Sequence, residues 1–321
     1  MNNYVGHESQ LYGVEEHRLV GGKGDGIRLF EVNNGNGIMF TVSADRAGDI
    51  SRLYFNGKNL GFFAPCGYVS PKYYDKDGLG FLKSFTAGFF TTCGLTAVGS
   101  PCNDNGEDLP LHGTISNTPA ENVSYWVDDK AIHLILTVRD AYLFGHKLVL
   151  TREYTCPLDK NEIVIRDKVK NIGDASAPYM ILYHMNMGYP LLSENSVVTI
   201  DSKGITPRNE VSAANIGDAL VMEKPQAGFE EQCFFHDMKT GMAKIYNPDI
   251  NTSLSIIYNT DELPYFTEWK MMGSGQYALG LEPGNCTPEG RDVVRKNGNL
   301  VELAPGEEKT QTITIRISNE A

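Results

Sequence analysis

The sequence of 321 residues lacks the features that mark membrane, secreted and metal-binding proteins. No apolar run approaches the ~18 residues of a membrane-spanning helix. The N-terminal stretch MNNYVGHESQLYG has neither the basic nor the apolar region of a secretory signal. The six cysteines are spread singly, without the paired spacing of a zinc site or the density of a disulfide scaffold. These absences predict a cytoplasmic protein with reduced thiols and no membrane association.

Clustered positive charge is missing as well. The formal net charge at pH 7 is −12, whereas nucleic-acid binding requires grouped Lys and Arg that neutralise phosphates. The composition therefore argues against a nucleic-acid partner. Acidity alone identifies no other partner, and nothing in the pattern indicates an oligomeric state.

Long stretches with helical periodicity are also lacking, and the best helix candidate is short, around residues 209–219. Alternation of apolar and polar residues recurs instead, and it predicts strands in residues 26–46, 130–156, 161–173, 240–260 and 307–318. Repeated strands with turn residues between them are typical of an antiparallel sandwich or barrel. Because no linker or repeat divides the chain, we predict one all-β domain over residues 1–321, with residues 1–30 as an N-terminal extension packed on it.

Three short pieces carry side chains suited to chemistry: LPLHGTISNTPAE with His112, LYHMNMGYPLL with His184, and YALGLEPGNC with Glu282. In a strand, Ala278 and Gly280 share a face with Glu282, so two tiny residues leave a groove in front of the carboxylate. Burying such a carboxylate is costly unless it has a partner or a ligand.

Each of these residues has a structural alternative. Glu282 could form an ion pair at a strand end, His184 could be a hydrogen-bonded core histidine, and His112 could bond the local backbone in a turn. No H-x-H, H-E-x-x-H or G-x-S-x-G pattern occurs, which argues against a metal and against a serine nucleophile. A glycosidase would pair Glu282 with a second carboxylate, such as Glu231 or Asp49.

Together with further pieces, these motifs make the chain resemble the galactose mutarotase-like (aldose 1-epimerase) superfamily, and more closely an aldose 1-epimerase-like branch of it. The pieces are Asp45-Arg46…Asp49-Ile50, GFFTTCGL, LHGTISNTPA, LYHMNMGYPLL, ELPYFTEWK and LGLEP. The resemblance covers most of the chain. It implies a β-supersandwich of long antiparallel strands, with a carbohydrate cleft on one sheet face and no cofactor.

The resemblance also implies roles: His184 as general acid, Glu282 as general base, and His112 as a sugar-binding residue. With reference pKa values of about 4.3 for Glu and about 6.5 for His, we expect Glu282 to be ionised and His184 to carry a proton. The chain departs from better-known mutarotases at Tyr183, where they tend to have Asn, and at Thr114, where they have a second glycine. These departures leave the identity of the sugar open.

Six more residues are candidates for substrate binding. Trp269 suits stacking on a pyranose, with core packing as its alternative. Arg46 and Asp49 either reach the sugar or form an ion pair with each other. The remaining candidates are Asn186, which shares a strand face with His184, together with Lys270 and Glu231.

Three functions remain open at this point. The leading hypothesis is a mutarotase or related epimerase acting on a free or modified aldose. The second is a non-catalytic carbohydrate-binding or sensing protein on the same scaffold. The third is a sugar-phosphate epimerase, which would need several Arg or Lys side chains converging on the cleft.

Overall fold

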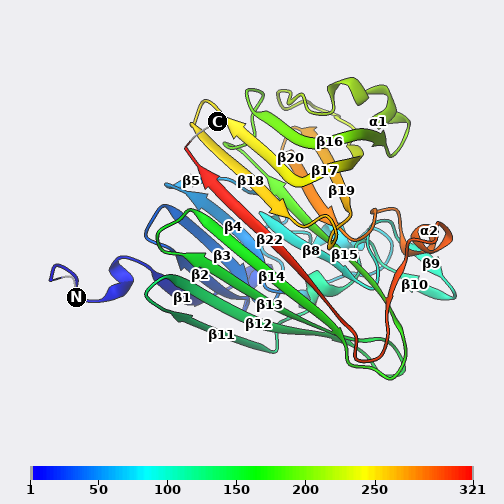
Figure 1. Cartoon of the computed structure of the whole chain (residues 1–321), viewed down its shortest axis with the longest axis horizontal. Helices are drawn as coiled ribbons and strands as arrows, with labels where there is room; N and C mark the ends of the chain where they lie inside the picture. The colour runs from blue at the N-terminus through cyan, green and yellow to red at the C-terminus, as the bar shows by residue number, and fades with distance from the viewer. Residues whose placement is uncertain (1–2, 320–321) are drawn as a thin grey trace.

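The computed structural model describes residues 3–319 as two large antiparallel sheets with few helices. The smaller sheet has five strands, all from the N-terminal part of the chain (Figure 1). In spatial order they are β1 (Gly13–Arg18), β2 (Arg28–Asn33), β3 (Ile38–Ser43), β4 (Asp49–Phe55) and β5 (Lys58–Asn59).

The larger sheet has thirteen strands. Along its main path the order is β11 (Asn122–Val127), β12 (Ala131–Ala141), β13 (Lys147–Pro157), β14 (Glu162–Asn171), β22 (Glu308–Ser318), β18 (Thr252–Tyr258), β17 (Gln232–Asn247), β19 (Tyr265–Gly273), β20 (Gln276–Gly284), β15 (Ala177–Met187) and β21 (Val301–Leu303). Two more strands pair beside this path, β16 (Val197–Pro207) with β17 and β8 (Phe90–Leu95) with β15.

The core lies between the two sheets, where Figure 1 shows β2, β3 and β4 behind β12, β13 and β14. The ring centroids of Phe40 and Tyr154 are 5.9 Å apart across this interface. The Tyr154 hydroxyl donates to the carbonyl of Gly48 at 2.7 Å. Arg152, fully buried on β13, donates from Nη1 to Asp49 Oδ1 of β4 at 2.7 Å, so an ion pair joins the sheets inside the core.

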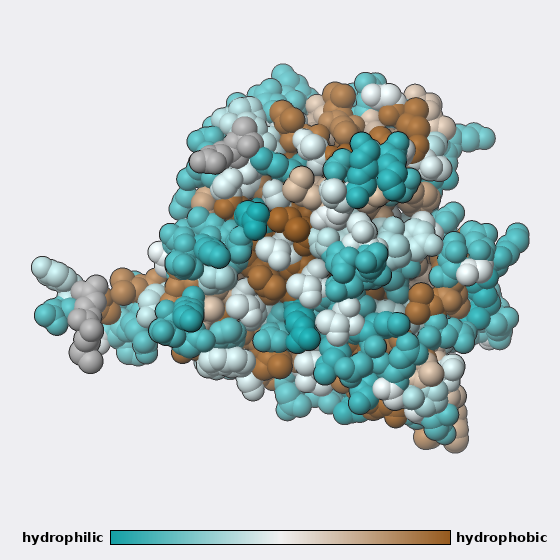
Figure 2. All heavy atoms as spheres, in the orientation of Figure 1, coloured by the Kyte–Doolittle hydropathy of each residue, from teal (hydrophilic) through white to brown (hydrophobic). Residues whose placement is uncertain are grey.

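The outer face of the large sheet follows the alternation of the sequence. Buried Ile313, Ile315 and Ile317 of β22 alternate with less buried polar residues, as predicted. Hydrophilic residues accordingly cover most of the face seen in Figure 2.

Helices are short and connect strands. They are α1 (Glu210–Ala214) and α2 (Arg291–Lys296), with 3-10 turns at Glu8–Gln10, Gly22–Gly24, Pro71–Tyr73, Gly80–Lys83, Ile115–Asn117 and Ile216–Asp218. The helix predicted around 209–219 corresponds to α1 and the turn that follows it, whereas α2 was not predicted. Within residues 3–319, no helix is long and apolar enough to cross a membrane.

Four short strands complete the fold: β6 (Phe62–Phe63) with β7 (Ala87–Gly88), and β9 (Cys102–Asp104) with β10 (Glu107–Leu109). The all-β antiparallel sandwich is therefore confirmed. The single domain over residues 1–321, with residues 1–30 as an extension, stays a prediction. Residues 1, 2, 320 and 321 lie outside the described part of the chain.

Candidate functional site

Three neighbouring strands of the large sheet, β15, β20 and β19, carry the candidate site (Figure 1). A row of side chains across these strands forms its floor. Thr267 of β19 pairs with Glu282 of β20, and the register between β20 and β15 places His184 opposite Glu282 on the other side. Directly paired residues project to the same face of a sheet. His184, Glu282 and Thr267 therefore stand side by side.

The distance between His184 Nε2 and Glu282 Oε1 is 3.2 Å. Their side chains are 7% and 2% exposed, so the pair is almost completely removed from solvent. Two sequence candidates that are 98 positions apart are thus brought together at the floor of one site.

Burial sets the protonation of this pair, and here the sequence-based expectation was wrong. Burial raises the pKa of Glu282 well above its ordinary value; Arg208 opposes the shift and Glu231 adds to it. Burial also lowers the pKa of His184 to about 4, and the side chain of Asn186 opposes this shift. Without solvent, both charged forms are disfavoured. Burial thus favours the protonated carboxyl of Glu282 and the neutral imidazole of His184 over a carboxylate beside an imidazolium.

A second row on the same face makes room for the carboxylate. Gly280 pairs with Trp269 on one side and with Asn186 on the other. A Cβ atom on Gly280 would lie 2.2 Å from Glu282 Oε1 and 3.0 Å from the Trp269 Cβ. The small residue before Glu282, noted in the sequence, is therefore required by the position of the carboxylate.

Aromatic rings surround the imidazole of His184. The ring centroids of Phe85 and Trp269 each lie 5.4 Å from it, and that of His112 lies at 5.8 Å, all in edge-on arrangements. Phe81 extends the wall, with its centroid 5.4 Å from that of His112. This apolar enclosure is the physical cause of the low pKa of His184.

His112 is held by its own loop with one ring nitrogen directed away from the backbone. Its φ of +58° is in the left-handed region, and the N–H of Gly99 donates to its Nδ1 at 3.4 Å. Burial lowers the pKa of His112 to about 3, with His184 and Arg208 adding to the shift. A neutral ring whose Nδ1 accepts a bond carries its proton on Nε2. His112 can therefore donate a hydrogen bond from Nε2.

These residues line a cavity of about 280 Å³. Its full lining is Leu79, Phe81, Leu82, Phe85, Gly99, Ser100, Pro101, Leu111, His112, His184, Arg208, Glu231, Cys233, Thr267, Trp269, Glu282 and Pro288. The volume lies near the lower bound of small-molecule sites, about 300 Å³. Such a cavity is suited to one small ligand.

Two charged residues stand at the exposed side of the cavity. Glu231 Oε2 accepts a hydrogen bond from Trp269 Nε1 at 2.9 Å, which fixes the indole. Arg208 donates from Nη2 to Ser100 Oγ at 2.9 Å and is exposed. Glu231 and Trp269 were candidates from the sequence, whereas Arg208 was not.

The structure places Asn186 and Lys270 outside the cavity lining. Asn186 Nδ2 donates to the carbonyls of Gly88 and His184, at 3.2 and 3.0 Å, so Asn186 is fully buried beneath the site. Lys270 is on the opposite face of β19 from Trp269, is 1% exposed, and donates from Nζ to the carbonyl of Asp218 at 3.0 Å. The Nδ2 atom of Asn186 and the Nζ atom of Lys270 thus donate to protein carbonyls, and neither residue lines the cavity.

Arg46 and Asp49 also lie outside the cavity lining, in the region between the two sheets. Arg46 Nη1 donates to Asn117 Oδ1 at 2.8 Å, and burial lowers its pKa to about 10. The carboxylate of Asp49 accepts from the backbone N–H of Thr92 at 2.9 Å and pairs with Arg152. The ion-pair partner of Asp49 is thus Arg152, rather than Arg46 as considered from the sequence.

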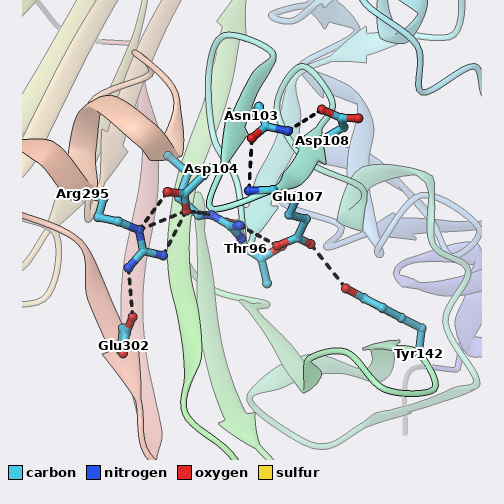
Figure 3. A network of polar contacts seen from close by, with 10 residues as sticks. Thr96, Asn103, Asp104, Glu107, Asp108, Tyr142, Arg295 and Glu302 are labelled. Carbon is cyan, nitrogen blue, oxygen red and sulfur yellow. Dashed lines mark hydrogen bonds and ion pairs between the residues drawn. The ribbon is translucent and has the colours of Figure 1, made fainter.

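A polar network joins the hairpin of β9 and β10 to α2 (Figure 3). The hairpin of β9 and β10 lies in the chain between two wall segments, residues 99–101 and 111–112. Asp104 at the end of β9 accepts from Arg291 Nε at 2.6 Å and from Arg295 Nε at 2.9 Å, both of α2. The hydrogen bonds from Arg295 lower the pKa of Asp104, so the network holds the hairpin with an ionised carboxylate.

A family model described as "Domain of unknown function (DUF4432)" matches residues 24–317. A comparison with curated proteins gives no match.

Several solved structures are similar over nearly the whole chain. One is a "putative aldose 1-epimerase" from Klebsiella pneumoniae subsp. pneumoniae MGH 78578, with 25% identity, a TM-score of 0.90, and coverage of 97% of this chain and 86% of that one. A galactose mutarotase-like protein from Clostridium acetobutylicum has 13% identity, a TM-score of 0.68, and coverage of 97% and 99%. A galactose 1-epimerase from Lactobacillus acidophilus NCFM has 14% identity, a TM-score of 0.65, and coverage of 97% and 100%. The fold is therefore that of the galactose mutarotase-like β-sandwiches.

Proposed function

From the premise that the chain belongs to the DUF4432 family and has the galactose mutarotase-like fold, we propose that it is an aldose 1-epimerase that interconverts the anomers of a small sugar. The observation that carries the proposal is the His184–Glu282 pair, 3.2 Å apart at the floor of a cavity of about 280 Å³. The names of the similar solved structures agree with it.

The chemistry requires two proton transfers. A proton leaves the hydroxyl on C1 of the cyclic sugar while another reaches the ring oxygen, the C1–O5 bond breaks, and a carbonyl forms at C1. Rotation about the C1–C2 bond and reversal of the transfers then close the ring with the other configuration. Each positioned acid or base contributes about 10²–10⁴-fold to such a step.

The His184–Glu282 pair can accept the proton of the C1 hydroxyl and donate one to the ring oxygen, so the number of protons bound to the pair is the same before and after the step. At rest it holds one proton, on Glu282, because burial disfavours both charged forms. Moving that proton to His184 creates the base at Glu282 and the acid at His184. Glu282 then accepts the C1 hydroxyl proton while His184 donates to O5, and the pair again holds one proton.

The surrounding residues would hold the sugar. His112 would donate from Nε2 to a hydroxyl, because its Nδ1 is occupied by the Gly99 N–H. Trp269, fixed by Glu231, offers an indole face for the C–H face of a pyranose. Asn186, Lys270, Arg46 and Asp49 lie outside the cavity lining, so we propose no direct contact between them and the sugar.

A phosphorylated substrate is less well supported. A phosphate dianion is normally held by several converging cations. Within the described residues 3–319, Arg208 is the one Arg or Lys that lines the cavity. We therefore propose a non-phosphorylated aldose. A cytoplasmic location and the lack of a cofactor stay predictions.

The test is anomer exchange of aldoses, followed by NMR line exchange or polarimetry, with wild type beside Glu282→Gln and His184→Asn. Loss of catalysis in both variants, with retained fold by circular dichroism, supports the proposal. Exchange that is as fast in the variants as in the wild type contradicts the roles of the pair. Sugar binding without exchange in the wild type would instead favour a carbohydrate-binding protein.

A further inference from the structure

The hydroxyl of Thr267 has no hydrogen-bond partner within residues 3–319. Thr267 is 1% exposed and lines the cavity beside Glu282. Buried hydroxyl groups in proteins are almost always hydrogen-bonded, and an unpaired one costs free energy. Because no protein group satisfies it, the cavity is the place from which a partner for Thr267 can come.

A second threonine in the same row differs in this respect. Thr91 of β8 pairs with His184 from the side away from Glu282. Its Oγ1 donates to the carbonyl of Ala87 at 2.6 Å, and it does not line the cavity. The row thus contains one threonine with a satisfied hydroxyl and one without, which makes Thr91 a matched control for Thr267.

The order of the row can be compared with the order of atoms in a sugar. Across β15, β20 and β19 the side chains run His184, Glu282, Thr267. In the proposed reaction His184 serves the ring oxygen O5 and Glu282 serves the hydroxyl on C1. In the sugar ring, C1 is bonded to O5 on one side and to C2 on the other. When O5 lies at His184 and C1 at Glu282, C2 lies next to Thr267.

We propose that Thr267 binds the hydroxyl on C2 of the substrate, and that the protein therefore acts on aldoses with a C2 hydroxyl in preference to their 2-deoxy analogues. This inference rests on the proposed function, because the roles of His184 and Glu282 set the direction of the ring. A 2-deoxy sugar would leave the Thr267 hydroxyl buried without a partner. Because such an unpaired group costs free energy, the site should bind the 2-deoxy sugar less well.

The experiment uses D-glucose and D-galactose, each with its 2-deoxy and 6-deoxy analogue. Anomer exchange rates and binding affinities by calorimetry are measured for wild type, Thr267→Val, Thr267→Ser and Thr91→Val. Valine has nearly the shape of threonine and lacks the hydroxyl, whereas serine keeps it. For the wild type we expect kcat/KM to be about tenfold or more higher for the 2-hydroxy sugar than for its 2-deoxy analogue.

Thr267→Val should lower kcat/KM of the 2-hydroxy sugar about tenfold and leave the 2-deoxy sugar unchanged, so the preference disappears. Thr267→Ser and Thr91→Val should keep the preference. A preference that persists in Thr267→Val overturns the inference, as does one that concerns the 6-deoxy sugar, because Thr267 would then face the C5 side.

The two proposals fail in different ways. If sugars bind with the C2 preference but no exchange is catalysed, the catalytic proposal fails and the contact to C2 stands. If exchange is catalysed without a C2 preference, the contact fails and the catalytic proposal stands. A wild type that neither binds nor interconverts these sugars overturns both.

Discussion

Two buried His–Glu pairs lie on opposite faces of the same part of the large sheet. His184 and Glu282 are 3.2 Å apart and line the cavity, whereas His236 and Glu268 are 2.9 Å apart with both side chains fully buried on the core side. Glu268 directly follows Thr267 in β19, so one residue step separates the cavity face from the core face.

The two pairs differ in the hydrogen bonds made by the ring nitrogens of their histidines. His236 has partners at both ring nitrogens, Glu268 at Nε2 and the Ser202 hydroxyl at Nδ1, 3.3 Å away. The Nδ1 atom of His184 has no hydrogen-bond partner among residues 3–319. Each glutamate has one carboxyl oxygen, Oε1, without a hydrogen-bond partner among the described residues, so the difference lies in the histidines. A histidine bonded at both ring nitrogens is held in the core, while a histidine with an unbonded nitrogen beside a cavity can exchange protons with a ligand.

The largest difference should appear when each carboxylate is replaced by its amide. Glu282→Gln should lower kcat by about 10²–10⁴-fold, because the residue no longer transfers a proton. Glu268→Gln should leave kcat nearly unchanged and lower the free energy of unfolding by about 1–3 kcal/mol, since it weakens a buried hydrogen bond. Exchange NMR and urea denaturation measure the two effects. Equal loss of activity in both variants would remove the distinction between the pairs.

Displacing the carboxylate without changing it should have the next largest effect. Gly280→Ala places a Cβ 2.2 Å from Glu282 Oε1, so the carboxylate must move. A displacement of this kind costs about 10²-fold in rate. Gly204→Ala on β16 is the control, because nothing lies within 4 Å of its added Cβ. Unchanged exchange rates in Gly280→Ala would mean that the position of Glu282 is not critical.

Changing the neighbour of each imidazole should have a smaller effect. Asn186→Leu removes the side chain that raises the pKa of His184, so this pKa should fall further below its value of about 4. The rate should fall about two- to tenfold, on the scale of one hydrogen bond. Ser202→Ala, beside His236, should leave the rate unchanged. NMR titration of His184 gives a readout that a purely structural role for Asn186 would not move.

The smallest change should come from pH. A histidine with an ordinary pKa would give an acid limb in kcat/KM near about 6.5. Because burial lowers the pKa of His184 to about 4, the acid limb should lie near pH 4. Above it the enzymatic rate should stay nearly constant until the pH reaches the raised pKa of Glu282, where the pair loses its proton and the rate falls. The rate should fall on the acid side because the reaction needs one proton shared by His184 and Glu282. Below the pKa of His184 the pair binds a second proton, and no base is left. A limb at the ordinary histidine value would contradict the dry environment of His184.

The sequence predicted many of the long strands and two of the three residues on the floor of the site, His184 and Glu282, but not Thr267. Apolar alternation located β12, β13, β14 and β22 because each buries one face. It did not predict α2, whose Arg291 and Arg295 are held by Asp104, which lies 187 and 191 positions earlier in the chain. Contacts of that range leave no local pattern.

Several residues of the cavity walls and the protonation of the His184–Glu282 pair could not be predicted from the sequence, because both depend on the three-dimensional packing. Phe81, Phe85 and Arg208 come from connections and a strand end, where no periodicity marks them. Asn186 was assigned to the correct face, yet the carbonyl of Gly88 occupies its amide and keeps it from the cavity. The pKa values of the catalytic candidates depend on burial, which residue types alone do not specify.

The place of β22 in the large sheet has a consequence for how the protein is made. This strand, residues 308–318, lies between β14 and β18 and joins the half of the sheet with β11 to β14 to the half that contains the site. A growing chain that has not reached residue 308 has two unpaired strand edges in the middle of its largest sheet. Such edges can pair with other chains. Until synthesis passes that point, we expect these exposed edges to make the nascent protein prone to aggregation and dependent on chaperones.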